Sequence, residues 1–435
     1  MHKIILVGLC LLWSSCLLFA QVQVIFDEGV EANKWEPLTL QMTGPSACET
    51  DGLTNGLHNP FSDYNVNVIW TKGSKTYTVP GYFAADGNAA NTGATCGDRW
   101  QAHFTPDEAG TWNYSIRFYA GTDVALDIHP TQGTTVAPHN ATGSIVVQGV
   151  NTGLSARDNR VKGRLQYVGE HYLRFAESQA WFFKGGADAP ENTLAYDDFD
   201  ATPDVPANSS SGSRFRKSWQ PHSGDYQAAD AAAYTWQSGK GQNLLGALRY
   251  LGDLAGVNAF SFLTFSAAGD DQNVFPHLLK VPMATYETYV GGNQSTGRRQ
   301  QWTQGLHHDR FDVSKLAQWE KIFSYGDKKG LFMHFKLYET ENDNLMDGNT
   351  FGPETQLYLR EMVARFQHHL ALNWNLGEEI TISNSKIRDM ANYVRALDAY
   401  DHHLVLSIPV LQSEISRGLR YNWFGTVAAT IAYIK

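Results

Sequence analysis

Apolar and polar positions follow two different patterns along this chain. From Gln21 to about Gly149, short alternating runs are separated by Gly, Pro, Asn and Asp. Period-two alternation between turn-forming residues predicts strands. We expect them at Tyr64–Trp70, Thr76–Val79, Trp112–Tyr119 and Ser144–Val147. Several short strands without helical periodicity predict an immunoglobulin-like β-sandwich over residues 21–150.

Residues 151–175 form a polar linker and a short β segment, and the pattern then changes. Apolar positions at helical spacing predict helices at Leu244–Ala255, Val313–Lys329 (with Asp312 as its N-cap), Gln356–Leu370 and Asn384–Leu397. Apolar runs between them predict strands at Trp181–Lys184, Ala259–Phe265, Leu331–Phe335, Leu372–Leu376 and His403–Ile408. Alternating strands and helices are typical of parallel βα units. Residues 176–435 therefore predict a (β/α)8 barrel of TIM type, but only about five of the eight units are recognisable and the pattern is incomplete or divergent after about residue 406.

Composition narrows the class of protein. The chain has 435 residues and a formal net charge of −10, from 34 Lys and Arg against 44 Asp and Glu. This acidic balance argues against a nucleic-acid-binding protein, which carries a basic patch. The 43% of apolar residues excludes a disordered chain. Beyond the amino terminus, no stretch reaches the roughly 18 apolar residues of a membrane span.

The first twenty residues, an apolar run after Lys3 that ends at Ala20, predict a secretory signal peptide. The mature protein would then be secreted or periplasmic. Cys16 leaves a lipoprotein as a less favoured alternative, because Trp13 fits a lipidation signal poorly. Cys48 and Cys96 remain in the mature chain and are disulfide candidates in an oxidising compartment, with two free thiols as the alternative.

Candidate site residues follow the predicted strands, because barrel enzymes carry their reacting groups at the carboxyl ends of strands. We expect substrate-binding roles for Lys184, Asp188, Glu191, Asp270, Asp271, Lys336, Glu339, Glu341, Trp374 and Asn375. Glu378 closes the apolar strand and is the candidate acid/base, since a glycosidase acid must be partly desolvated to hold its proton. The alternatives are a surface glutamate for Glu378 and a core residue for Trp374.

Metal and cofactor sites are not predicted. The pairs His307-His308, His368-His369 and His402-His403 are adjacent residues, which point in different directions in a helix or a strand. Asp270, Asp271 and Asn273 lack the calcium-loop pattern. The sequence also lacks a Gly-x-Ser-x-Gly elbow and a phosphate-binding glycine loop.

Several segments resemble one family of secreted bacterial proteins: Trp181–Asp200, Asn258–Pro276, Phe335–Asp347 and His368–Glu379. In this family a β-sandwich called domain of unknown function 5060 precedes a glycoside-hydrolase-like (β/α)8 barrel. Gly81-Tyr82-Phe83 and Trp100–Trp112 resemble the sandwich, and the likeness covers about residues 22–406. It implies a carbohydrate-active protein that acts on algal or similar polysaccharides.

The resemblance also implies roles for residues. Related barrels place the acid/base after strand four, which matches Glu378, and the nucleophilic carboxylate after strand seven, for which this sequence has no match. Many of them have Asn where this chain has Gly377.

These observations together predict a secreted glycosidase that acts on an algal or plant polysaccharide by a retaining, two-carboxylate mechanism. A sulfated or uronic substrate would contact Lys184, Lys336 and Arg310. The alternatives are a carbohydrate-binding protein without turnover, an inactive truncated remnant and, less favoured, a polysaccharide lyase with Lys336 or Tyr338 as its base.

Overall fold

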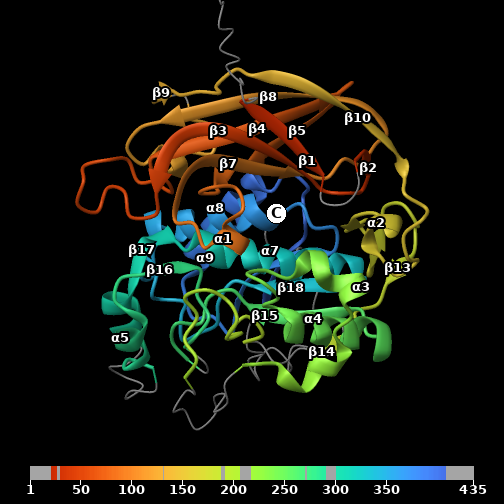
Figure 1. Ribbon diagram of the computed structural model, residues 1–435. Helices are drawn as coiled ribbons and strands as arrows, with labels where there is room; N and C mark the ends of the chain where they lie inside the picture. Colours follow the sequence, from red (N-terminus) through yellow and green to blue (C-terminus); the bar gives the residue numbers. More distant parts are fainter. Residues whose placement is uncertain are drawn as a thin grey trace, which may run out of the picture.

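A computed structural model describes residues 21–26, 30–130, 132–187, 192–205, 217–269, 272–290 and 300–407 (Figure 1). The predicted signal peptide at residues 1–20, with Cys16, lies outside these ranges, as does everything after residue 407. No helix in the described ranges has the length and apolar character to cross a membrane.

Residues 22–150 form two sheets that lie face to face at one end of the molecule (Figure 1). One sheet has the order β1-β3-β7-β6, from Val22–Phe26, Leu38–Cys48, Cys96–Phe104 and Tyr82–Phe83. The other has the order β2-β10-β8-β4-β5, with β9 added to β8, from Ala32–Lys34, Thr142–Val150, Gly110–Ala120, Tyr64–Lys72, Lys75–Pro80 and Thr134–Thr135. The rings of Trp70 on β4 and Phe104 on β7 stack 4.5 Å apart and join the two layers. The alternating pattern thus predicted four of these strands correctly.

Strand β3 escaped the sequence analysis because it contains Gly44 and Pro45, which normally interrupt a strand. A register shift after Thr43 accommodates them. The partner strand β7 was also missed. Trp100 of β7 packs against Gly44, where an added Cβ would lie 2.6 Å from the indole ring, and its Nε1 donates to the Pro45 carbonyl at 3.0 Å. Beyond this irregularity Cys48 and Cys96 lie opposite each other and form a disulfide.

A small antiparallel sheet, β11-β12-β13, follows the helix α2 (Asn159–Lys162) and comprises Leu165–Gln166, Leu173–Phe175 and Trp181–Phe182. The sequence assigned Trp181–Lys184 to the first barrel strand, and this was wrong. Trp181 and Phe182 pair with β12, and the Phe182 ring packs 5.2 Å from that of Phe332 beneath the parallel sheet. Parallel pairing begins only at β14 (Gly186–Ala187), where an added Cβ on Gly186 would lie 2.0 Å from the Ala259 carbonyl oxygen.

Five parallel strands in chain order form the second main sheet, β14-β15-β18-β19-β20. Beyond β14 they are Ala259–Leu263, Phe332–Lys336, Leu372–Glu378 and Leu404–Ser407. Their helices are α4 (Gln242–Arg249, continued by a π turn at Tyr250–Leu254), α7 (Val313–Lys328), α8 (Pro353–Phe366) and α9 (Asn384–Leu397). Asp312 caps α7 as predicted, its side chain accepting from Lys315 N. The predicted alternation of β and α is confirmed, and within the described residues the sheet is open, with β14 and β20 at its edges.

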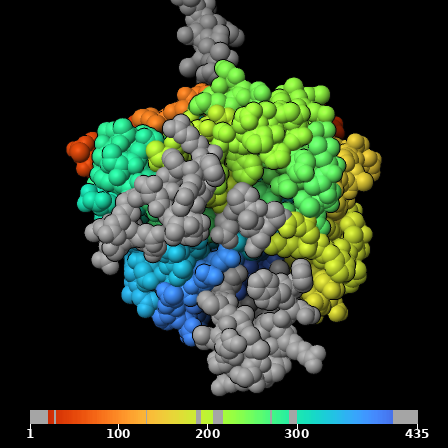
Figure 2. All heavy atoms as spheres, turned by 90° about the horizontal axis from the view of Figure 1, so that it is seen from below, coloured from red at the N-terminus to blue at the C-terminus, as the bar shows by residue number. Residues whose placement is uncertain are grey.

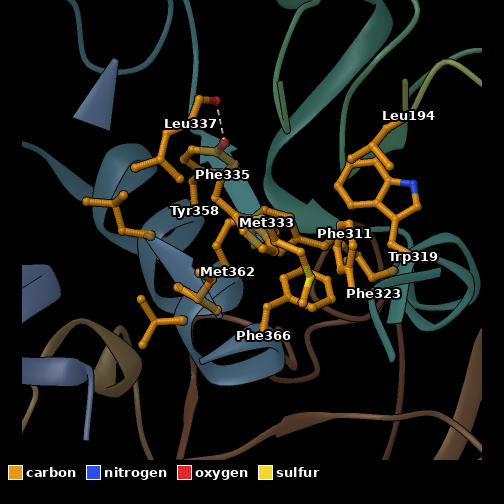
Figure 3. Close-up of a cluster of buried hydrophobic side chains, with 14 of the residues drawn as sticks. Leu194, Phe311, Trp319, Phe323, Met333, Phe335, Leu337, Tyr358, Met362 and Phe366 are labelled. Carbon is orange, nitrogen blue, oxygen red and sulfur yellow. Dashed lines mark hydrogen bonds between the residues drawn. The ribbon is translucent and has the colours of Figure 1, made fainter. Parts of the chain in front are cut away.

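The helix-facing side of this sheet is apolar (Figure 3). Phe335 of β18 contacts Phe366 of α8 at 5.7 Å between ring centroids, and Phe323 of α7 lies 5.0 Å from Phe366. Full burial of each such ring stabilises the fold by roughly 1.5–3 kcal/mol. The Tyr358 hydroxyl, at the same core, donates to the Leu337 carbonyl at 2.6 Å. This core fixes α7 and α8 against the sheet and thereby sets the positions of the strand ends.

The helices α7 and α8 lie between the parallel sheet and the two antiparallel sheets (Figure 1). Figure 2 shows the side away from the antiparallel sheets, where the green segment containing α4 and the blue segment containing α9 border the same face. The remaining elements are short: α1 (Ala89–Thr92), turns at Val124–Leu126, Gln220–Asp225, Ala232–Tyr234 and Gln301–Gly305, α3 (Ala228–Ala231), α5 (Met283–Glu287), and the antiparallel pair β16 (His277–Leu279) and β17 (Leu306–Phe311).

Candidate functional site

The two sides of the parallel sheet carry different side chains. Phe262, Phe335 and Trp374 face the helices, as their ring contacts show. Because successive strand residues alternate between faces, the residues between them project from the other side. The register places Ser261 of β15 opposite His334 of β18, and Lys336 of β18 opposite Asn375 of β19. The side that faces away from the helices is therefore polar.

His334 connects three of the neighbouring strand ends. Its Nδ1 lies 2.9 Å from Ser261 Oγ and 3.1 Å from Nζ of Lys184, which lies two residues before β14, at the amino end of that strand. Its Nε2 lies 3.2 Å from Asn375 Nδ2. We call Lys184, Ser261, His334, Lys336, Asn375 and Glu378 the strand-end cluster.

Glu378 is turned into this cluster by an irregularity in β19. The register with β20 shifts between Asn375 and Glu378, and Glu378 N donates to the Tyr338 carbonyl at 3.0 Å. Gly377 lies at the shift, where an added Cβ would be 2.3 Å from Ile380 Cγ2. This backbone path thus leaves room only for a glycine at residue 377, the position at which the chain departs from the family pattern.

An ion pair defines the chemistry of the cluster. Lys336 Nζ lies 2.6 Å from Glu378 Oε2, and the lysine side chain is 0% exposed whereas that of Glu378 is 23% exposed. The buried ammonium balances the charge of an ionised Glu378 carboxylate. The Glu378 side chain is thus partly exposed at the face of the sheet.

A second group of carboxylates lies at the adjacent strand end. Glu339 forms a backbone bridge with Glu378, and its Oε1 accepts from Ser266 Oγ at 3.3 Å. Gly269 packs against both Glu339 and Glu341, with an added Cβ 2.7 Å from Glu339 Oε1 and 3.1 Å from Glu341 Cβ. The structure thus brings Lys336, Glu339, Glu341, Asn375 and Glu378 of the predicted residues to neighbouring strand ends. Lys184 was predicted to follow the first strand but precedes β14, and it joins the group through His334. Asp188, Glu191, Asp270 and Asp271 lie outside the described residues.

Trp374 and Arg310 do not join this group. Trp374 is fully buried, and its Nε1 donates to Asp398 Oδ2 at 2.9 Å, so the core interpretation is the one that its surroundings support. Arg310 of β17 is buried against the antiparallel region, where its Nη1 donates to the Glu49 carbonyl at 2.8 Å. Residue type suggested ligand contacts for both, but side-chain direction decides against them.

Two residues that the sequence analysis missed hold the strand-end loops in place. Asp343 Oδ2 accepts from Thr381 N at 2.6 Å and from Thr381 Oγ1 at 2.9 Å, which ties the loop after β18 to the loop after β19. Lys386 Nζ donates to the carbonyls of Met346 at 2.8 Å and Gly348 at 2.7 Å. Local sequence gave no signal for either, because the partners lie on different βα units.

A second polar cluster lies between the antiparallel sheets and the helices. We call His103, Glu320, Asp327, His368 and His369 the junction cluster. Glu320 Oε1 lies 3.1 Å from His368 Nε2, Glu320 Oε2 lies 3.2 Å from His369 Nε2, and Asp327 Oδ2 lies 2.9 Å from His369 Nδ1. The adjacent histidines therefore share one carboxylate, contrary to the geometric expectation, because they follow the end of α8 in a turn rather than in a regular element.

Charges in the junction cluster are mutually compensated. Burial by itself lowers the pKa of His369, but the carboxylates of Glu320 and Asp327 outweigh burial and raise it to about 10. Burial raises the pKa of Glu320, yet the two histidines reverse this effect and leave it well below its usual value. A cavity of about 310 Å³ adjoins the cluster and is lined in part by His103, Glu320 and Asp327.

Comparison with known proteins supports the predicted family for one segment. Residues 31–119 match the model described as Domain of unknown function (DUF5060). The predicted resemblance is confirmed, and the matched segment runs from β2 into β8. No curated protein matches the chain.

Solved structures show what the fold resembles. A provisionally assigned glycoside hydrolase from Bacteroides vulgatus ATCC 8482 aligns with a TM-score of 0.52 at 14% identity, over 87% of this chain and 56% of that one. The chain thus spans little more than half the length of that protein. A glycosyl hydrolase family 2 member from Bacteroides cellulosilyticus DSM 14838 aligns with a TM-score of 0.29 at 9% identity (90% and 36% coverage). A Bacteroides ovatus GH5 xyloglucanase aligns with a TM-score of 0.27 at 9% identity (88% and 65% coverage). At such identities the first likeness indicates a glycoside-hydrolase-like fold, with mixed β and α/β content.

Proposed function

We propose that this protein is a secreted glycosidase that cleaves a polysaccharide of algal or plant type, with Glu378 as its acid/base. The observation that carries the proposal is the Lys336–Glu378 ion pair, 2.6 Å long, at the carboxyl ends of two adjacent parallel strands. Barrel enzymes carry their reacting groups at this end of the sheet. The likeness of the fold to a provisionally assigned glycoside hydrolase supports the same class.

In a retaining reaction Glu378 would first protonate the leaving oxygen while a second carboxylate attacks the anomeric carbon. It would then act as a base and take a proton from the water that releases the sugar. The contact with Lys336 Nζ fixes the position of the Glu378 carboxyl group for both steps. The sequence offers no match for this second carboxylate, so the nucleophile is not assigned.

The remaining cluster residues supply groups for a sugar. Asn375 and Lys184 offer donors, whereas Glu339 and Glu341 offer acceptors for hydroxyl groups. Two ammonium groups, Lys184 and Lys336, contact His334 and Glu378 on the same side of the sheet. The exposed ammonium of Lys184 favours a substrate with sulfate or uronate groups over a neutral one.

The lyase alternative is weakened by the contacts of its two candidate bases. Tyr338 is buried with its hydroxyl 2.9 Å from Met390 Sδ, and burial raises its pKa well above 10. Lys336 is fully buried and paired with Glu378. Neither group is placed to remove a proton from a uronate, so glycan binding without turnover is the stronger rival.

We further propose the domain boundaries that the sequence pattern suggests: a signal peptide at 1–20, an immunoglobulin-like β-sandwich at 21–150, a connecting segment at 151–175 and a (β/α)8-type barrel from 176 onward. The two face-to-face sheets and the open parallel sheet support this division. Secretion rests on the sequence of residues 1–20 alone.

The test compares two neighbouring glutamates. New reducing ends are measured on a panel of sulfated, uronic and neutral polysaccharides for the parent chain, for Glu378→Gln and for Glu379→Gln. Glu379 is the matched control, because it is exposed and has a left-handed backbone with φ of 51°. We expect Glu378→Gln to lose at least about 1,000-fold in rate and Glu379→Gln to retain the parent rate. Binding by the parent without any new reducing ends would contradict the enzyme and leave the binding protein.

A further inference from the structure

Three potential metal ligands meet in the junction cluster. His103 of β7, Glu320 of α7 and His368 beyond α8 each offer one ligand atom, and these atoms lie within 4.8 Å of one another. We propose that the junction cluster binds one transition-metal ion of the zinc class, with His103, Glu320 and His368 as its protein ligands. Such an ion would connect the antiparallel sheets to the helices of the parallel sheet.

The donor set selects the class of ion. Two imidazoles and one carboxylate form a three-residue set typical of zinc, with bonds of about 2.0–2.2 Å and a fourth position for water. Magnesium and calcium prefer oxygen ligands and are therefore disfavoured. Tetrahedral geometry places ligand atoms roughly 3.4 Å apart, so binding requires small side-chain rotations that draw the three groups together.

Outer contacts already orient two of the ligands. His103 Nδ1 lies 2.8 Å from Thr39 Oγ1, and its Nε2 lies 2.6 Å from the Tyr82 hydroxyl. Whichever nitrogen binds the ion exchanges its hydroxyl partner for the metal, and the other contact continues to fix the ring. Such outer-shell hydrogen bonds are a regular part of metal sites. Glu320 is likewise held from behind, because its second oxygen contacts His369.

The cluster also contains an unsatisfied group. His368 is fully buried, and its Nδ1 has no hydrogen-bond partner among the described residues. A buried nitrogen without a partner is costly. Glu320 Oε1 contacts only the Nε2 side of this ring, so the hydrogen bonds of the surrounding side chains leave the polar environment of His368 incomplete.

The adjoining cavity supplies an entry path. It reaches both His103 and Glu320 and has a volume of about 310 Å³, which exceeds what one ion and its water need. Two arginines line the same cavity, but each is neutralised by its own carboxylate. Arg160 pairs with Asp158 at 2.7 Å and Arg365 with Glu361 at 2.6 Å. Lys321 also lines the cavity, and its Nζ donates to the Ala233 carbonyl at 3.1 Å.

The experiment uses the whole chain, purified without a polyhistidine tag and stripped with a chelator. Zinc is titrated by calorimetry, the bound metal is counted, and the thermal midpoint is followed. We expect one zinc ion per chain and a midpoint that rises by several degrees. His103→Gln and Glu320→Gln should lose both effects. His58→Gln is the control and should keep them, because this histidine is half exposed on a loop of the antiparallel region.

Cobalt binding to the parent chain decides the question if the ligand variants fail to fold. A four-coordinate cobalt spectrum that zinc abolishes would support the proposal. The proposal is overturned if the stripped parent takes up neither ion at concentrations up to about 100 μM and its midpoint does not move. The junction cluster would then be a hydrogen-bonded ion network only.

Discussion

The strand-end cluster and the junction cluster contain the same types of residue, but we propose different roles for them. Each combines carboxylates, histidine and cationic groups, and each is anchored on elements of the parallel-sheet region. In the strand-end cluster Lys184 is exposed and the Glu378 side chain is 23% exposed. In the junction cluster His368 and His369 are 0% exposed. The two clusters therefore differ in their access to solvent, which depends on how whole layers pack. The strand-end cluster is a candidate reaction centre, whereas the junction cluster holds two layers together.

We expect the largest effect, a loss of stability, when one buried carboxylate is removed from the junction cluster. Asp327→Asn leaves the cationic ring of His369 with Glu320 as its remaining counter-charge. Removal of one partner of a buried ion pair costs about 3–5 kcal/mol. Denaturant unfolding measures this loss, and Asp389→Asn, an exposed residue of α9, is the control. Equal stability of the two variants would show that the contact between Asp327 and His369 does not stabilise the fold.

The same type of change in the strand-end cluster should affect the reaction more than the fold. Lys336→Met keeps the length of the side chain and removes the ammonium that pairs with Glu378. We expect kcat to fall by about 100-fold, as when a preorganised charged group is lost from an active site, with a smaller change in KM. The half-exposed Lys240 provides the control as Lys240→Met. An unchanged kcat would remove the ion pair from the mechanism.

Substitution of Trp374 tests whether its side chain belongs to the core or stacks on a sugar ring. Trp374→Phe removes the hydrogen bond to the buried carboxylate of Asp398, which should cost about 1–3 kcal/mol in stability. Glycan affinity should stay the same. Trp181→Phe, at the exposed ring on β13, is the matched control and should leave stability unchanged. A loss of affinity without a loss of stability would restore the stacking role of Trp374.

The smallest expected effect is a pH-dependent change in stability at Glu49, which contacts the start of α7. Burial, with the nearby charge of Asp312, raises the pKa of Glu49 to about 9. The folded protein therefore holds a proton that the unfolded chain releases near its ordinary value of 4.5, and the free energy of unfolding falls as the pH rises between these values. Glu49→Gln cannot ionise and keeps the acceptor for Val313 N. It should be more stable than the parent by about 1 kcal/mol or more at about pH 8 and nearly equal at about pH 5. The reverse order at about pH 8 would contradict a protonated Glu49.

Local patterns predicted the elements that carry the strand-end cluster. The helix at Asn384–Leu397 was predicted to the residue, because its apolar positions recur at helical spacing. The strand containing Asn375 was also correct, although it runs on to Glu378. Carboxyl ends of parallel strands lie at one edge of a sheet, so a sequence-based prediction could bring Lys336, Asn375 and Glu378 together.

The junction cluster could not be predicted in the same way. His103, Glu320 and His368 are separated by long stretches of chain and belong to a strand, a helix and a turn. Their meeting depends on how the antiparallel sheets dock onto α7 and α8, which no local pattern encodes. The wrong assignment of Trp181–Lys184 has a related cause, since an apolar run is equally suited to a parallel strand and to the small antiparallel sheet beneath it.

One paired measurement tests most directly whether the strand-end cluster supports the reaction and the junction cluster supports the stability of the fold. Reducing-end release and thermal midpoint are recorded side by side for Glu378→Gln and Glu320→Gln on the polysaccharide that the parent cleaves best. The account predicts that Glu378→Gln stays folded without releasing product, and that Glu320→Gln melts earlier while its folded fraction releases product at the parent rate. Product release by Glu378→Gln at the parent rate, or loss of release in Glu320→Gln without a lower midpoint, would contradict it.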